Sequence, residues 1–341
     1  MREWQSNSLS LFSSALKKLD LRANWQTMGW MTGILPLTIS PETEPAAPVA
    51  YDTPYTLDGP AGPAAPVLFA SPHSGNEYPE RMQSALCVPL IDLRRTEDAF
   101  VEELFADAPA LGATLMAARY GRSVADLNRD PRELDATMFS DGLPRMSGLP
   151  TARVDAGLGA LPRVASRGEA IYARRLTRAE GEERLRLVHD AYHDRLGLEL
   201  GALRDTHGAV LLIDCHSMPS ADESRQNKSS PLADIVLGDY HGKSCDPLIT
   251  DAAEQICRDI GLSVTRNKPY AGGYTTKHYG QPKYNFHCLQ IEIKRSLYMD
   301  ELRVERGPGL AQLIRQMRRL INTMTSIDFS SLIPPSLICA E

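Results

Sequence analysis

The sequence predicts an α/β layer fold built on a largely parallel central sheet. Short apolar runs typical of buried strands alternate along the chain with segments of helical periodicity. The clearest strand-like run is continuously apolar, as expected when both faces of a sheet are covered. Such alternation is typical of parallel strands joined by helices. Functional residues are then expected at the carboxyl ends of the strands.

The first half of this fold begins after a proline-rich stretch. Residues 67–71 form an apolar run that ends at a Pro-His-Ser-Gly turn, which indicates a buried strand. Residues 97–106 place apolar side chains on one helical stripe, and residues 113–119 are a second candidate strand. A long helix is predicted over residues 177–208, with a capping-box pattern at its start and glycine at its end.

The second half repeats the alternation. Residues 209–214 are the predicted central strand. A helix is predicted over residues 247–260, closed by Gly261, with Leu248 among its inward side chains. Residues 288–293 alternate like a half-buried strand, and residues 310–321 carry the apolar stripe of a last amphipathic helix.

The 341 residues correspond to about two domains of ~150 residues or to one large domain. Eight of the 24 prolines lie between Pro36 and Pro66, where they favour an extended or poorly ordered chain. We therefore expect an N-terminal extension and linker over residues 1–50, one folded domain over 51–325 and a tail over 326–341. A targeting sequence is the alternative interpretation of the extension.

Composition excludes several classes of protein. Thirty-seven basic and 43 acidic residues give a net charge of −6, so no broad basic surface is expected for nucleic acid. No apolar run is long enough for a membrane span. The six cysteines form no CxxC pair, which argues against a disulfide framework or a cysteine-rich zinc module and favours the cytoplasm.

Polar side chains gather where the predicted strands end. His73 follows the first strand, His216 closes the central strand, and Glu292 lies within the late strand, while Asp98 opens the helix after the first strand. Two histidines and a carboxylate leave one position open for water, as in a catalytic zinc site, and Glu292 would accept the proton of that water.

Each of these residues also has a purely structural interpretation. A strand-end histidine is commonly a hydrogen-bonded structural residue, and Asp98 alone is typical of a helix start. Glu292 alone would suit an ion pair with Lys294 or Arg295. Glu77 is an alternative carboxylate ligand.

A second cluster is cationic and contains Arg122, Asn128 and Arg129. An arginine fork pairs with a carboxylate through two hydrogen bonds, and a neighbouring asparagine can orient the same ligand. The alternative is a surface salt-bridge run with nearby acidic residues. The Gly/Tyr-rich residues 267–274 have the composition of a lid with glycine hinges and aromatic walls, and we assign Tyr274 to substrate binding.

These segments together resemble the N-formylglutamate amidohydrolase family. The resemblance covers residues 51–321 and consists of eight short motifs in one order. They are Ser-Pro-His-Ser-Gly at 71–75, Arg-Thr-Glu-Asp at 95–98 leading into 103–105, Asp-Leu-Asn-Arg at 126–129, Glu-Leu-Asp at 133–135, Asp-Cys-His-Ser-Met-Pro at 214–219, Leu-Gly-Asp at 237–239 with His-Gly at 241–242, residues 267–274, and Gln-Ile-Glu-Ile at 290–293 with Arg295 and 297–299.

The resemblance implies a three-layer α/β/α fold with a mixed, largely parallel sheet, phosphorylase/hydrolase-like as in zinc carboxypeptidases. It also implies one zinc ion, or another divalent metal, per chain. Zinc carboxypeptidases place a glutamate three residues after the first histidine, where this chain has Asn76. Asp98 is therefore our choice for the acidic ligand beside His73 and His216, with Glu77 and Glu97 as the alternatives.

The implied reaction is hydrolysis of N-formyl-L-glutamate to formate and glutamate, a step of histidine degradation. Glu292 would be the general base, and Arg122 would stabilise the oxyanion or clamp a second carboxylate. Asn128 and Arg129 would hold the substrate carboxylate, and Arg295 would add positive charge to the pocket. The alternatives are a deacylase or amidase of the same group that acts on another N-acyl amino acid or peptide fragment, and a non-catalytic binding protein.

Overall fold

The computed structural model describes residues 51–146, 148, 151–220 and 232–332. At its centre is a seven-stranded sheet with the strand order β1-β3-β2-β4-β7-β5-β6. The strands are β1 (Tyr55–Asp58), β2 (Val67–Ser71), β3 (Thr114–Ala118), β4 (Val210–Met218), β5 (Ile235–Gly238), β6 (Val264–Arg266) and β7 (Phe286–Lys294). Strands β2, β3, β4 and β7 run parallel, and β1 and β5 are antiparallel to their neighbours β3 and β7. The mixed, largely parallel sheet confirms the prediction.

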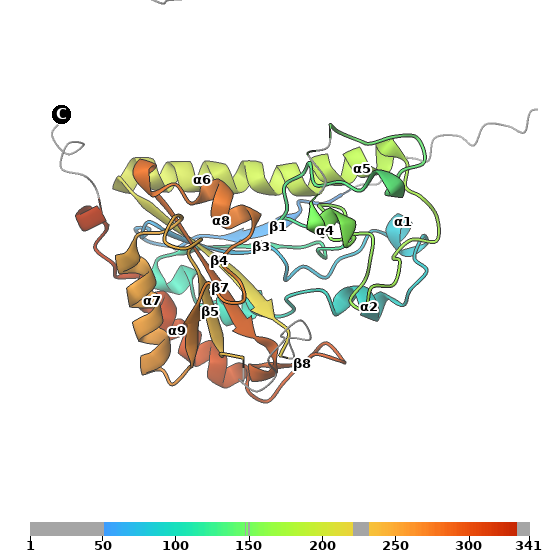
Figure 1. The fold of residues 1–341 in the computed structure, drawn as a ribbon. Helices are drawn as coiled ribbons and strands as arrows, with labels where there is room; N and C mark the ends of the chain where they lie inside the picture. The colour runs from blue at the N-terminus through green and yellow to red at the C-terminus, as the bar shows by residue number, and fades with distance from the viewer. Residues whose placement is uncertain (1–50, 147, 149–150, 221–231, 333–341) are drawn as a thin grey trace, which may run out of the picture. The chain divides into compact units, whose positions relative to one another are not determined.

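Helices cover both faces of the sheet (Figure 1). The longer ones are α5 (Arg178–Arg184), α6 (Ala191–His207), α7 (Pro247–Asp259) and α9 (Leu310–Thr325). A π-helical turn (Leu185–Asp190) joins α5 to α6. Successive residues of β2 enter two separate apolar clusters: Leu68 packs with residues of α6, and Phe69 packs with residues of α7 and α9. This alternation divides the core into the two halves of a three-layer fold.

Shorter elements surround the carboxyl ends of the parallel strands. They are α1 (Glu80–Gln83), α2 (Leu90–Arg94), α3 (Val101–Leu104), α4 (Ala152–Asp155), α8 (Tyr274–Tyr279) and a two-stranded sheet of β8 (Met299–Asp300) and β9 (Glu305–Arg306). The capping box predicted at the start of α5 is present, formed by Thr177 and Glu180. Gly208 and Gly261 have positive φ after α6 and α7, as predicted for helix ends.

Three expectations differ from the structure. The helix expected over residues 97–106 is reduced to α3, because Phe100 has a left-handed φ of 66° and the chain turns there. Strand β7 is buried on both faces between β4 and β5, so it is not half-exposed. Leu248 in α7 is 47% exposed, since Ile249 and its neighbours one turn apart take the inward face.

The predicted extension over residues 1–50 lies outside the described residues. At the other end α9 closes at Thr325, and a short turn (Phe329–Leu332) follows it. Phe329 is buried in the same cluster as α7 and α9, so the packed chain continues past residue 325. Within the described chain, no helix is long and apolar enough to cross a membrane.

Candidate active site

Three neighbouring parallel strands bring the predicted site residues together. His73 follows β2, His216 lies in the last part of β4, and Glu292 lies in β7 directly opposite His216. Asp98 comes from the turn before α3, and its backbone N–H donates to the carbonyl of His73 at 2.9 Å. The predicted strand-end cluster therefore exists as a single buried group of side chains.

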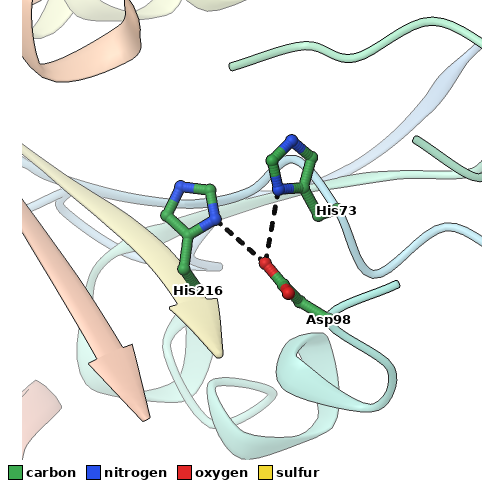
Figure 2. Close-up of side chains that lie close together, drawn as sticks. All are labelled: His73, Asp98 and His216. Carbon is green, nitrogen blue, oxygen red and sulfur yellow. Dashed lines mark hydrogen bonds and ion pairs between the residues drawn. The ribbon is translucent and has the colours of Figure 1, made fainter. Parts of the chain in front are cut away.

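His73, Asp98 and His216 converge on one point. Figure 2 shows an oxygen of Asp98 facing a nitrogen of each ring. Asp98 Oδ2 lies 3.3 Å from Nδ1 of His73 and 3.0 Å from Nδ1 of His216. Two ligands bound at ~2.0–2.1 Å to a tetrahedral ion stand roughly 3.3 Å apart. The separations from Asp98 to each histidine are close to this value, and the three ligand atoms lie within 4.8 Å of one another, so they could hold a metal ion.

Each ring has a carboxylate near its outer nitrogen, and the hydrogen bond that His73 makes there supports a metal. Nε2 of His73 lies 2.8 Å from Asp126 Oδ1, and Nε2 of His216 lies 3.0 Å from Asp214 Oδ1. An ionised carboxylate only accepts hydrogen bonds, so Nε2 of His73 carries the proton and Nδ1 presents a lone pair. That Nδ1 atom has no hydrogen-bond partner and faces the Asp98 carboxylate. Two facing acceptors need a cation between them, and carboxylates behind ligand histidines are typical of metal sites.

The charges of the group are strongly coupled. Burial raises the pKa of Asp98, but the hydrogen bond with His216, the neighbouring His73 ring and the charge of Arg295 outweigh it, so that the pKa is well below its usual value. Burial lowers the pKa of His216, yet Asp214 and Asp98 raise it well above the ordinary value. Without an ion, the site therefore favours a cationic ring at His216. A bound metal would replace that proton.

The second oxygen of Asp98 is held by Arg295. The guanidinium donates to Asp98 Oδ1 at 2.9 Å, to Oγ of Ser217 at 3.1 Å and to the carbonyl of Arg95 at 3.1 Å. Each of its three nitrogens thus has an acceptor within the protein. We infer that Arg295 orients the Asp98 carboxylate, although it also lines the cavity where the sequence places it beside substrate.

The two alternative carboxylates lie outside this group. Glu77 is half-buried and pairs with Arg119 at 2.9 Å. Glu97 is buried and accepts a hydrogen bond from Tyr78 Oη at 2.7 Å, and burial raises its pKa to about 7. Only Asp98 has an oxygen within reach of both histidines in the described chain.

Glu292 stands beside the candidate metal ligands. Its Oε1 accepts a hydrogen bond from Nε2 of Gln290 at 2.8 Å. Burial raises the pKa of Glu292 to about 7; the His216 charge opposes this shift, and Asp98 and Asp214 add to it. A carboxylate that is easily protonated near neutral pH is suited to general acid–base work.

A cavity of about 410 Å³ opens over this group. Arg122 and Arg129 line it with Asn128, so the cationic cluster singled out in the sequence lies at this cavity. Arg122 donates to Asp126 Oδ2 at 2.7 and 3.2 Å, and it thereby also supports His73 through that carboxylate. Arg129 donates only to backbone carbonyls in the described chain, which leaves its charge without a carboxylate partner.

Asn128 is fixed on both sides of its amide. Its Oδ1 accepts from the backbone of Thr275 at 2.9 Å, and its Nδ2 lies 3.0 Å from Nε2 of His216. The loop before α8 packs so closely that a Cβ at Gly273 would clash with the Asn128 side chain. Asn128 thus joins the candidate metal centre to the cavity wall.

The Gly/Tyr-rich loop lines the cavity, but Tyr274 does not. Pro269, Tyr270 and the residues up to Gly273 form part of the wall. Tyr274 is not among the lining residues, because it begins α8 and its ring packs on His193 and His278. Tyr270 is the aromatic residue of this loop that the structure places at the cavity.

Four residues in the site were given no role from the sequence. Asp126 and Asp214 lie behind the two histidines, and Gln290 holds Glu292. Asp126 and Asp214 each stand two residues before a site residue, Asn128 and His216, a spacing that could have indicated supporting carboxylates. Arg153 also lines the cavity. No motif marks it in the sequence.

Comparison with known proteins gives a consistent result. The family model of N-formylglutamate amidohydrolase matches residues 65–299. N-formylglutamate deformylase of Pseudomonas putida is 32% identical over 234 residues, which are 67% of this chain and 80% of that protein. The deformylase of Pseudomonas aeruginosa is also 32% identical, over 238 residues.

Two solved structures share the fold. The crystal structure of N-formylglutamate amidohydrolase from Ralstonia eutropha JMP134 has a TM-score of 0.77 and 34% identity, and the match covers 80% of this chain and 98% of that one. A gene product of Agrobacterium tumefaciens has a TM-score of 0.56 and 19% identity, covering 81% and 95% of the two chains, which is a likeness of fold alone.

Proposed function

The chain belongs to the N-formylglutamate amidohydrolase family, and from this premise we propose that it hydrolyses N-formyl-L-glutamate to formate and L-glutamate with the help of one divalent metal ion. The observation that carries the proposal is the convergence of two histidines and Asp98 on one point, with Glu292 directly beside them. Zinc is the metal that we propose, because two imidazoles and a carboxylate are a common zinc ligand set. The same ligands would also accept iron or cobalt.

His73, Asp98 and His216 would hold the metal. A metal ion in such a site polarises a carbonyl oxygen and makes water acidic enough to act near neutral pH. Glu292 takes the proton from the attacking water at its carboxylate and passes it to the departing amine. Gln290 keeps Glu292 in position through its 2.8 Å hydrogen bond.

Substrate is held by the cationic side of the cavity. Arg129 has no carboxylate partner among the described residues, so a substrate carboxylate supplies one, and the Asn128 amide orients the same group. Arg122 reaches the cavity beside His73 and stabilises the negative charge that develops on the formyl oxygen. In this arrangement Arg129 and Asn128 bind the substrate, and Arg122 stabilises the transition state.

Formate release from N-formyl-L-glutamate tests the proposal. We expect activity with about one metal equivalent per chain, and loss of both metal and activity in His73→Ala and His216→Ala. His207→Ala is the matched control, because His207 ends α6 outside the cavity and should keep metal and rate.

Three outcomes would overturn parts of the proposal. Full metal retention in both histidine variants would remove the metal centre. Faster release of another acyl group, such as acetate from N-acetylglutamate, would assign the chain to a different deacylase activity. Binding of N-formylglutamate without turnover in the metal-loaded protein would indicate a binding protein.

A further inference from the structure

The cavity wall carries more positive charge than the protein itself neutralises. Five arginines line the cavity, and three of them pair with carboxylates inside the protein. The three pairs are Arg295 with Asp98, Arg122 with Asp126, and Arg95 with Asp92. Their charges are therefore already compensated before a substrate binds.

Arg129 and Arg153 are the remaining two. Arg129 donates to the carbonyls of Leu158 at 3.1 Å and of Asn128 at 2.9 Å, and neither acceptor carries a charge. Arg153 lies in α4 and makes no side-chain hydrogen bond or ion pair with any residue that the structure describes. Burial lowers the pKa of Arg129, the nearby charge of Asp126 raises it, and the charges of Arg122 and Arg153 lower it further. Neither Arg129 nor Arg153 forms an ion pair with a carboxylate of the described chain, so an anion between or beside them would relieve their mutual repulsion.

The two arginines lie at different depths. The candidate metal ligands and Glu292 are buried at the floor of the cavity, Arg129 is half-buried, and Arg153 is exposed. We infer from this difference in exposure that Arg153 lies nearer the mouth than Arg129 and farther from the reacting bond. In an N-acyl dicarboxylic amino acid, the α-carboxylate is close to the hydrolysed amide and the side-chain carboxylate is farther away.

The wall between them suits the rest of such a ligand. Residues 153–166, which we name the outer wall, contribute the side chains of Leu158, Pro162 and Val164 to the lining. Methylene groups of a substrate can pack on this apolar surface while its two charged ends reach the two arginines. The Leu158 carbonyl also accepts from Arg129, which ties the outer wall to the deeper arginine.

We propose that Arg153 binds the side-chain carboxylate of the substrate and makes the enzyme selective for N-acyl dicarboxylic amino acids, while Arg129 binds the α-carboxylate. This inference rests on the proposed function and adds to it the residue that selects the distal negative charge. An exposed arginine gains less from such a pair than a buried one, since water and salt screen it.

Paired substrates test the proposal. N-formyl-L-glutamate and N-formyl-L-glutamine differ in the distal charge, so Arg153→Gln should lower kcat/KM roughly ten-fold for the first and less than about two-fold for the second. Arg153→Lys should restore part of the difference. Arg129→Gln should lower kcat/KM for both substrates, because both carry an α-carboxylate. Arg167→Gln is the matched control, since Arg167 is an exposed arginine of the adjoining segment that does not line the cavity.

The result that overturns the proposal is an equal effect of Arg153→Gln on both substrates, or no effect on either. Binding of the product L-glutamate against L-glutamine, measured by calorimetry, gives the same comparison without turnover. If the wild type releases no formate but binds glutamate better than glutamine, and Arg153→Gln abolishes that preference, the proposed reaction is refuted and this inference stands. Normal formate release with unchanged preference would refute this inference alone.

Discussion

The floor and the outer wall of the cavity are built in different ways. The floor consists of His73, Asp98, His216 and Glu292, which are all buried; the two histidines and Glu292 lie on or just after strands of the central sheet, and Asp98 lies in the turn before α3. The outer wall is a short helix followed by turns, and the arginine through which it lines the cavity, Arg153, is exposed. The sheet fixes the positions of the reacting groups relative to one another, and the irregular segment determines which substrate binds beside them. Changes in the floor should therefore affect rate and metal, and changes in the wall should affect selectivity.

The largest effect is expected at the floor, in Glu292→Gln. Glutamine keeps the shape and the hydrogen bond with Gln290 but cannot take a proton from water, so kcat should fall by about 10²–10⁴-fold. Metal content, substrate affinity and thermal midpoint should stay close to those of the wild type. The acid limb of the pH–rate profile should disappear, because protonation of Glu292 inactivates only an enzyme that has this carboxylate.

A structural role for Glu292 makes the opposite forecast. Glutamine would then lower the thermal midpoint while kcat changed within a few-fold. That result would mean that another residue is the general base. The contrast between a floor that controls rate and a wall that controls selectivity would then no longer hold.

Arg295 provides the next test, since it lines the cavity but donates to the Asp98 carboxylate. Lysine keeps the charge and loses the fork that joins Asp98, Ser217 and the Arg95 carbonyl. Metal affinity in Arg295→Lys should fall about 10–100-fold, as is typical when a group that orients a metal ligand is changed. Competition with a metal indicator measures it. A higher KM with unchanged metal affinity would instead place Arg295 at the substrate, as the sequence suggested.

The smallest effect is expected at His193, which contacts the residue before Asn128, and it concerns stability and not rate. His193 in α6 contacts the Leu127 carbonyl at 2.8 Å and Tyr279 Oη at 2.9 Å, next to Asn128. Burial, with the neighbouring charge of His189, lowers the pKa of His193 to about 3. An unfolded chain protonates this ring below pH ~6.5, and the folded protein does not, so stability is present above that pH and is lost as the pH falls.

The loss attributable to His193 should reach about 2 kcal/mol at pH 5. Urea unfolding of the wild type and of His193→Asn at pH 8 and pH 5 measures it, since the variant lacks this titration. The free energy of unfolding should depend less on pH in the variant. Parallel pH dependences would mean that His193 is accessible to protons in the folded state.

The sequence predicted the floor better than the wall, for physical reasons. His73, His216 and Glu292 belong to apolar runs whose strand character is a local property, and parallel strands bring their carboxyl ends together. Asp98 could not be separated from Glu97 and Glu77 in the sequence, because the choice depends on tertiary contacts: Glu97 accepts from Tyr78, Glu77 pairs with Arg119, and only Asp98 meets both histidines in the described chain.

The residues that were missed or misplaced depend on tertiary contacts. Arg153 lies in a segment without strand or helix periodicity, so nothing in the sequence places it at the cavity. Tyr274 was assigned to substrate binding because it follows the glycines of a candidate lid. In the structure it is the first residue of α8, and its ring packs on His193 and His278 instead of lining the cavity.

The pairing of β4 with β7 has a consequence for how this protein can change over evolution. His216 and Glu292 stand opposite each other because nine consecutive residues of the two strands are paired in register. Insertion or deletion of one residue within either strand would turn all later side chains to the other face of the sheet. These strands can therefore accept substitutions but not insertions or deletions. The outer wall is under no such constraint, and a lineage that acquires a new substrate would be expected to carry its insertions and deletions there.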